Sequence, residues 1–65
     1  MPNENDSAFS FIGLQVEQVR CEDPIYQFYV GRKGLVVDAF TDEKGQVHVR
    51  TDDGIWCPAR LVASF

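Results

Sequence analysis

Glycine residues divide the segment 30–65 into short runs, and this spacing constrains the fold more than any other feature of the chain. Gly31 and Gly34 flank the first turn, and Gly45 and Gly54 occupy the next two turns. Between them lie runs of about six residues that are rich in β-branched and aromatic side chains. Short strands with a glycine at each corner are typical of a small closed barrel. The sequence therefore predicts an all-β fold.

Five segments are predicted to form the strands: 14–19, 35–40, 46–51, 55–57 and 61–65. Alternation in the third segment predicts that Val47 and Val49 point into the core. The second segment, LVVDAF, is nearly continuous in apolar residues, which predicts burial on both of its sides. A bulge near Gln18 is expected to turn Val19 inward. A 3₁₀ turn that starts at Pro58 is predicted before the last strand.

The start of the chain is predicted to lie outside the fold. Residues 1–8, MPNENDSA, are polar and carry acidic groups, which is typical of a disordered tail. The barrel domain is then predicted to cover residues 9–65. Phe9 and Phe11 break the polarity, and we expect them to pack on the open end of the barrel; a docking motif is the alternative.

The longest connection, CEDPIYQFY, follows the first strand. Asp23 before Pro24 predicts an N-capped helical turn, because Asp is a preferred cap and Pro suits the first helical position. The connection is too apolar for a solvent-exposed loop that packs against nothing. We therefore expect it to fold over the barrel, with Ile25 packing inward beside Phe28 or Tyr29.

The chain is acidic, with ten Asp and Glu residues against six Lys and Arg residues and a net charge of −4. Since affinity for nucleic acid depends largely on Lys and Arg, this charge argues against direct binding to DNA or RNA. Acidity favours solubility, and it would also steer the domain toward a basic protein surface. The paired acidic residues lie in predicted turns. Solvent-exposed turn residues are therefore a simpler interpretation of these pairs than catalytic carboxylates. We predict no enzyme activity and no cofactor.

Cys21 and Cys57 are the only cysteines of the chain. The first residues contain no apolar secretory segment, and no run approaches the roughly 20 apolar residues of a membrane span. We therefore expect a cytoplasmic protein with both thiols reduced. A zinc site from these two cysteines and His48 would lack a C-x-x-C pair and a fourth ligand, so no metal site is predicted.

The end of the chain resembles that of SH3-like barrels. The pattern G-x-W-x-P-x-x-L-V is formed here by Gly54, Trp56, Pro58, Leu61 and Val62. The segment GRKGLVV, residues 31–37, is similar to the G-x-x-G-x-V turn and strand of KOW-type and other bacterial SH3-like domains. The resemblance covers residues 13–65 and implies a five-stranded SH3-like barrel.

Within this fold, the acidic charge is similar to that of small bacterial SH3-like antirepressors, which occupy the DNA-reading face of a repressor. The first strand, LQVEQV, lacks the A-L-Y-D-Y-like start of eukaryotic SH3 domains, so the resemblance does not extend to binding of Pro-rich peptides. It implies a small regulatory or adaptor protein that binds a basic protein surface and needs no membrane.

Exposed aromatic residues with acidic neighbours are the candidate partner-binding site, because Tyr and Trp are enriched in interface hot spots. The site residues predicted from the sequence are Tyr26, Tyr29, Trp56, Glu22, Asp23, Asp52 and Asp53. A competing interpretation places Trp56 and Phe28 in the core.

Two other functions stay open at this point. One is a KOW-like module that binds nucleic acid or the ribosome through a basic strip, and its bases would be Arg32, Lys33, Arg50 and Arg60. The other is an oligomeric enzyme built from barrels, with its pocket at the symmetry axis.

Overall fold

The computed structural model describes residues 6–65, and it describes side chains from Ala8 onward. Its elements in chain order are α1 (Asp6–Phe9), β1 (Gln15–Gln18), η1 (Pro24–Tyr29), β2 (Lys33–Thr41), β3 (Val47–Thr51), β4 (Trp56–Pro58), η2 (Ala59–Leu61) and β5 (Val62–Ser64), where η marks a 3₁₀ helix. The described chain is therefore mostly β, and the predicted 3₁₀ turn before the last strand is confirmed.

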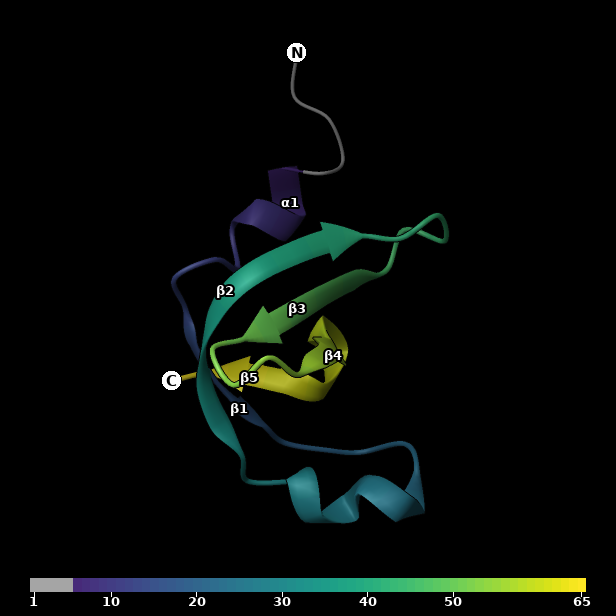
Figure 1. Ribbon diagram of the computed structural model, residues 1–65. Helices are drawn as coiled ribbons and strands as arrows, with labels where there is room; N and C mark the ends of the chain where they lie inside the picture. The colour runs from purple at the N-terminus through teal and green to yellow at the C-terminus, as the bar shows by residue number, and fades with distance from the viewer. Residues whose placement is uncertain (1–5) are drawn as a thin grey trace.

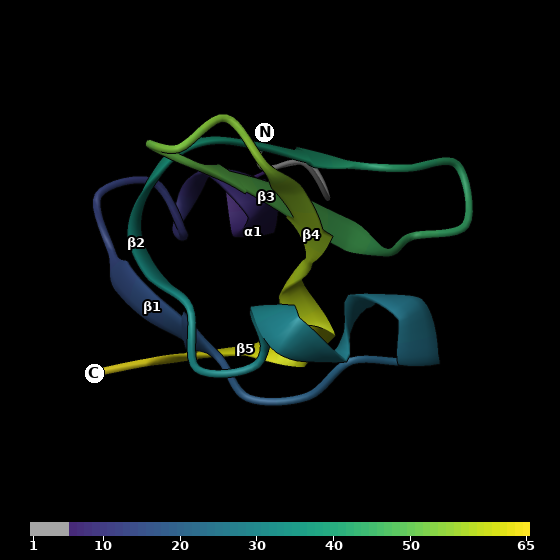
Figure 2. The same ribbon diagram turned by 60° about the horizontal axis from the view of Figure 1, so that its bottom comes forward.

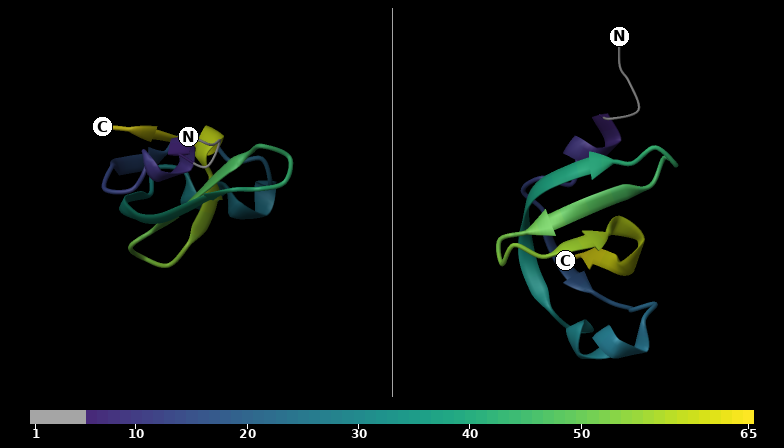
Figure 3. Two further views of the ribbon diagram at one scale, coloured as in Figure 1. Left: turned by 90° about the horizontal axis from the view of Figure 1, so that it is seen from above. Right: turned by 45° about the vertical axis from the view of Figure 1, so that its right-hand side comes forward.

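The five strands pair in the antiparallel order β4-β3-β2-β1-β5. The long strand β2 curves through the molecule, so that its first part pairs with β1 and its second part with β3 (Figure 1). Gly34 lies opposite Val16 in the first pairing, and Ala39 lies opposite Val49 in the second. The helices α1 and η1 lie at opposite ends of the molecule (Figure 3).

The sheet is not closed into the barrel that the sequence predicts. Strands β4 and β5 stand at the two ends of the strand order, and no ladder within residues 6–65 joins them. Each of these strands has only three residues, and Pro58 at the end of β4 has no backbone N–H to donate. The chain passes from one edge to the other through η2 instead.

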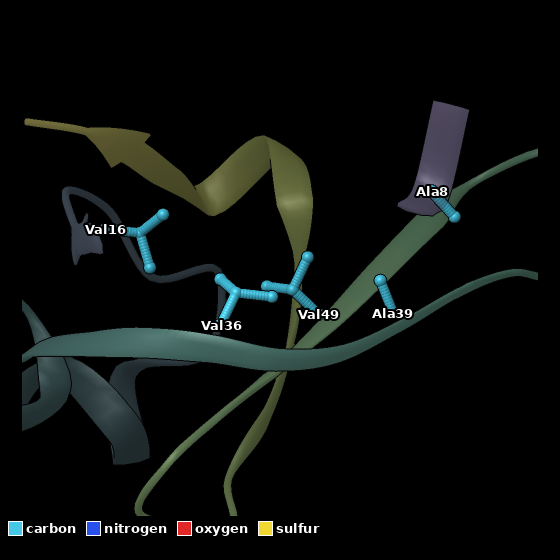
Figure 4. Packing of buried hydrophobic residues seen from close by; sticks show 5 residues of the cluster. All are labelled: Ala8, Val16, Val36, Ala39 and Val49. Atoms are coloured by element: carbon cyan, nitrogen blue, oxygen red, sulfur yellow. The ribbon is translucent and has the colours of Figure 1, made fainter. Parts of the chain in front are cut away.

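The core lies inside the curve of β2. Val16, Val36 and Val49 point toward one another there, and Ala39 meets Ala8 of α1 (Figure 4). Val49 is fully buried, which confirms its predicted orientation. The partly buried residues packed around this cluster are Phe11, Val47, Ala59 and Val62.

The bulge expected near Gln18 is wrong. The side chain of Gln18 is buried at 5% exposure, while Val19 is 44% exposed. The strand alternation simply continues past Val16, because the backbone N–H of Val19 bonds the carbonyl of Leu61 at 2.9 Å and keeps the strand in register. The buried amide of Gln18 donates to the carbonyl oxygen of Arg20 at 3.2 Å, which satisfies one of its polar atoms.

Strand β2 is also not buried on both sides, as its apolar run had suggested. Val36 and Ala39 are buried, whereas the apolar side chains of Leu35, Val37 and Phe40 are exposed. The pairing register shifts between Val36 and Asp38, which is a bulge. This shift explains why two inward residues are three positions apart rather than two.

The folded part begins earlier than residue 9, the predicted domain start. Residues 1–5 of the predicted tail lie outside the described residues, and residues 6–8 belong to α1. Ala8 is 1% exposed and sits in the core, and its carbonyl accepts a hydrogen bond from the N–H of Phe11 at 3.1 Å. Phe11 packs against the core as expected, but Phe9 is 60% exposed.

Candidate functional site

A groove of about 350 Å³ lies between η1 and the corner where β4 runs into η2. Figure 2 shows these elements on the same side of the molecule. The residues that line the groove are Gln18, Cys21, Glu22, Asp23, Tyr26, Tyr29, Ile55, Trp56, Cys57, Pro58 and Leu61. Five of the seven site residues predicted from the sequence are thus brought together, and they come from segments about 30 residues apart.

The first wall of the groove is η1, and its local sequence explains its shape. Asp23 caps the helix as predicted, because its carboxylate accepts the N–H of Ile25 at 3.0 Å. The backbone of Tyr26 leaves the helical region at φ −104° and ψ 16°, so η1 has a kink at this residue. The rings of Tyr26 and Tyr29 lie parallel within 10° at a centroid distance of 5.7 Å.

The inward packing expected for this helix is wrong. Ile25 and Phe28 are each 73% exposed. The face that turns toward the rest of the molecule is the one with Tyr26 and Tyr29, which line the groove. The guanidinium of Arg32 lies 5.9 Å above the Tyr29 ring and helps to hold it.

The second wall contains Trp56. This side chain is 45% exposed, so the interpretation of Trp56 as a core residue is wrong. Phe40 meets it edge to face at a centroid distance of 5.2 Å and an interplanar angle of 75°. The guanidinium of Arg50 lies 5.8 Å from the same ring. These contacts restrict the indole while leaving it accessible, which is the condition for an interface anchor.

Two of the four predicted acidic residues lie at the groove. Glu22 pairs with the guanidinium of Arg60, and this hydrogen bond and charge hold the pKa of the Glu22 carboxyl below its ordinary value. Asp23 uses one carboxylate oxygen to cap η1. Among the described residues Asp23 takes part in no ion pair, so its negative charge remains at the groove.

The other two, Asp52 and Asp53, do not line the groove. Asp53 holds the turn between β3 and β4: its carboxylate accepts hydrogen bonds from Arg32 at 2.7 Å, from the Ile55 N–H at 3.2 Å and from the Thr51 hydroxyl. Burial pushes the pKa of Asp53 up, but these hydrogen bonds outweigh it and hold the pKa below its ordinary value.

Asp52 belongs to a different surface, a hollow that it lines together with Lys33 and Phe65. Its carboxylate lies 3.4 Å from the N–H of Leu35 at the edge of β2.

Sequence reasoning missed that Cys21 and Cys57 both line this groove. It considered the two thiols only for their redox state and for a zinc site. Alternation in β4 predicts only the burial of Cys57, because an exposed Trp56 directs the next side chain to the other face; it does not predict that Cys57 lines the groove. The position of Cys21 depends on the packing of the long connection, which no local pattern reveals.

The predicted basic strip is largely neutralised. Arg32 lies 2.7 Å from Asp53, Arg50 lies 3.8 Å from Asp38, and Arg60 pairs with Glu22. Lys33, the remaining member, places its ammonium 5.2 Å from the Phe65 ring. Phosphate binding would compete with these existing pairs.

His48 lies outside the groove and contacts the hairpin loop. Its Nε2 is 2.8 Å from the carboxylate of Asp42, and its ring stacks on Phe40 at 5.1 Å. Within residues 6–65, no three His, Cys, Asp or Glu side chains are grouped in a way that could hold a metal ion. None of the described helices has the length and apolar character needed to cross a membrane.

Comparison of the chain with protein-family models, with curated proteins and with solved structures returned no match.

Proposed function

We propose that this chain is a small, non-enzymatic regulatory or adaptor protein of SH3-like type that binds another protein through the groove between η1 and β4. The observation that carries the proposal is the meeting of Tyr26, Tyr29 and Trp56 in one groove. All three side chains present large apolar rings with a polar tip, a combination enriched in interface hot spots.

The strand order supports the SH3-like assignment. A long bent β2 shared between two halves, a first connection that carries a helical turn, and a 3₁₀ turn between the last two strands are the features expected of that fold. Fold alone does not identify a function, so the proposal rests on the groove rather than on this likeness.

The partner we propose is a protein with a basic surface that also presents apolar side chains. The chain has a net charge of −4, and Asp23, which forms no ion pair among the described residues, lies at the groove. By analogy with the acidic antirepressors, the bound surface would be one that otherwise contacts nucleic acid. Charge of this kind raises the association rate more than the final affinity.

The test begins with a photo-reactive benzoylphenylalanine at position 26 and, as a control, at position 25. Tyr26 lines the groove and Ile25 does not, although both belong to the same 3₁₀ helix. A partner of this groove should cross-link from position 26 and much less from position 25.

The affinity of the purified partner is then measured for Tyr26→Ala and for Ile25→Ala. Loss of a central aromatic anchor costs about 2 kcal/mol or more, which is roughly a thirtyfold weaker Kd. Ile25→Ala should bind as wild type. Both variants should stay folded, and Tyr26→Ala should lose only the roughly 0.5–1.5 kcal/mol of its stacking on Tyr29. Equal affinity for all three proteins would refute the proposed site.

A further inference from the structure

The two thiols of the chain face the same groove. Cys57 lies in β4 and is 5% exposed, and Cys21 is half-buried in the segment that follows β1. Both are free cysteines, and both line the groove with Tyr26 and Trp56. No role in the proposed partner contact requires either of them.

Backbone and side-chain contacts bring the Cys21 segment beside the Cys57 segment. The N–H of Val19 bonds the carbonyl of Leu61 at 2.9 Å, and Glu22 pairs with Arg60. Residues 19–22 therefore run along η2, which begins two residues after Cys57. Both thiols therefore lie on segments that are held together at this groove.

We propose that Cys21 and Cys57 are a reversible oxidation site, at which exchange with a small disulfide such as glutathione disulfide forms a disulfide across the groove and closes it to the partner. The proposed bond rests on the position of both thiols at the same groove. The loss of partner binding rests on the proposed function.

The exchange proceeds in two steps that balance. The Cys21 thiolate attacks one sulfur of glutathione disulfide, forms a mixed disulfide and releases one glutathione thiolate. The Cys57 thiolate then attacks the Cys21 sulfur, forms the internal disulfide and releases the second glutathione. Two protein thiols lose two electrons, the oxidant gains them as two glutathione thiols, and the two protons pass to those thiols through solvent.

The order of the steps follows from access. Cys21 is the more exposed thiol and opens onto the groove, so it reacts first with a bulky oxidant. Cys57 is buried, and it reaches only a sulfur that is already inside the groove. Burial raises the pKa of Cys57, and the positive charges of Arg32 and Arg60 oppose this; the charge of Cys21, which raises this pKa in the reduced chain, is absent from the mixed disulfide. The second step should therefore accelerate with rising pH.

The disulfide would narrow the groove because of where its ends attach. Cys21 is followed directly by Glu22 and Asp23 and then by η1, and Cys57 is followed by η2. Joining the sulfurs at about 2 Å ties these two walls together and places the bridge in the groove between them. Trp56, the neighbour of Cys57, would lose solvent contact on its groove side.

The first experiment treats the full chain with glutathione disulfide at several pH values and follows the intact mass after acid quenching. We expect a monomer that has lost two hydrogen atoms and has no free thiol, and dithiothreitol should restore the starting mass. A Cys57→Ala variant should stop at one glutathione adduct, and a Cys21→Ser variant should react slowly. Stable glutathione adducts on the wild-type chain, or only cross-linked dimers, would overturn the oxidation site.

The second experiment measures closure without any partner. Trp56 is the only tryptophan of the chain, so acrylamide quenching of its fluorescence reports on the groove. We expect quenching to fall on oxidation of the wild type and to stay constant for a double variant, Cys21→Ser with Cys57→Ala, which has no thiol to react. A disulfide that forms without this change would overturn the closure.

The third measurement compares partner affinity of the oxidised and reduced forms, with the double variant Cys21→Ser with Cys57→Ala as the control. A loss of affinity on oxidation of the wild type alone is expected. If Tyr26→Ala already leaves binding unchanged, the proposed function fails while the disulfide result stands. If Tyr26→Ala weakens binding but oxidation does not, only the regulatory role fails.

Discussion

Gly34 of β2 lies against Thr51 of β3 so closely that a Cβ atom at Gly34 would come within 2.9 Å of the Thr51 Cβ. The same atom would lie 3.1 Å from the Thr51 Cγ2 and 3.2 Å from a carboxylate oxygen of Asp52. The contact lies where β2 passes from its pairing with β1 to its pairing with β3. The absence of a side chain at this point lets the two strands approach.

A Gly34→Ala substitution should therefore lower the free energy of unfolding by about 1–3 kcal/mol, the usual cost of overpacking. For a domain of this size, each kcal/mol shifts the melting temperature by roughly 4–8 °C. Thermal unfolding followed by circular dichroism measures the effect. A Thr51→Ser background removes Cγ2 but keeps the Cβ, so it should recover only part of the loss. An unchanged melting temperature for Gly34→Ala would contradict this close contact.

Two valines offer a matched test of the core. Val49 is fully buried in β3, and Val37 of β2 is 41% exposed. Val49→Asp buries a carboxylate without a partner, which costs several kcal/mol and should unfold a small domain. Val37→Asp should cost only about 1 kcal/mol, the span of strand propensities. Native circular dichroism and melting for Val49→Asp, or unfolding of Val37→Asp, would reverse the assignment of the two faces.

The hairpin loop between β2 and β3 should make stability sensitive to acid. Hydrogen bonds from His48, Gln46 and Lys44 and the charge of His48 hold the pKa of Asp42 below its ordinary value, although burial opposes them. A carboxyl with a lowered folded-state pKa stabilises the fold above its unfolded pKa near 4, and this stabilisation is lost as pH falls through the folded-state value.

Asp42→Asn should therefore melt below the wild type at pH 6, and the difference should shrink as the pH is lowered below about 4. Glu43→Gln, in the same exposed loop, is the matched control and should show a smaller difference. A gap between Asp42→Asn and wild type that stays constant from pH 6 to pH 2 would contradict the role of the Asp42 charge.

Local patterns predicted the parts of the fold that depend on neighbouring residues. The Asp23–Pro24 pair predicted the capped start of η1, and alternation predicted the burial of Val49. The exposed outer face of β2 was missed because a continuous apolar run has no alternation. Neither the exposure of Leu35, Val37 and Phe40 nor the bulge after Val36 therefore left a visible signal.

The parts that depend on distant residues were predicted less well. Asp53 is paired with Arg32, which is 21 positions away, and nothing local distinguishes it from Asp52. Strands β4 and β5 pair with β3 and β1 and not with each other, and this arrangement depends on geometry across the whole fold. The aromatic members of the groove were predicted from their chemistry, whereas Cys21 was found there only through the packing of the long connection.

Trp56 lines the proposed binding site and also makes contacts that stabilise the fold. Its replacement by alanine therefore tests both roles. Its ring is 45% exposed and contacts Phe40 and Arg50. Trp56→Ala should keep the fold and lose about 1–2 kcal/mol, since an aromatic pair contributes roughly 0.5–1.5 kcal/mol and an exposed cation–π contact roughly 0.5–1 kcal/mol. Phe28→Ala, at 73% exposure and outside the groove lining, is the control and should cost less.

A double-mutant cycle between Trp56→Ala and Phe40→Ala should give a coupling energy of about 0.5–1.5 kcal/mol, measured by urea unfolding. The partner affinity of Trp56→Ala should fall by at least as much as that of Tyr26→Ala, because both rings line the same groove. Phe40 does not line this groove, so Phe40→Ala should lower stability with a smaller effect on affinity. Complete unfolding of Trp56→Ala would return this residue to the core and remove it from the binding site.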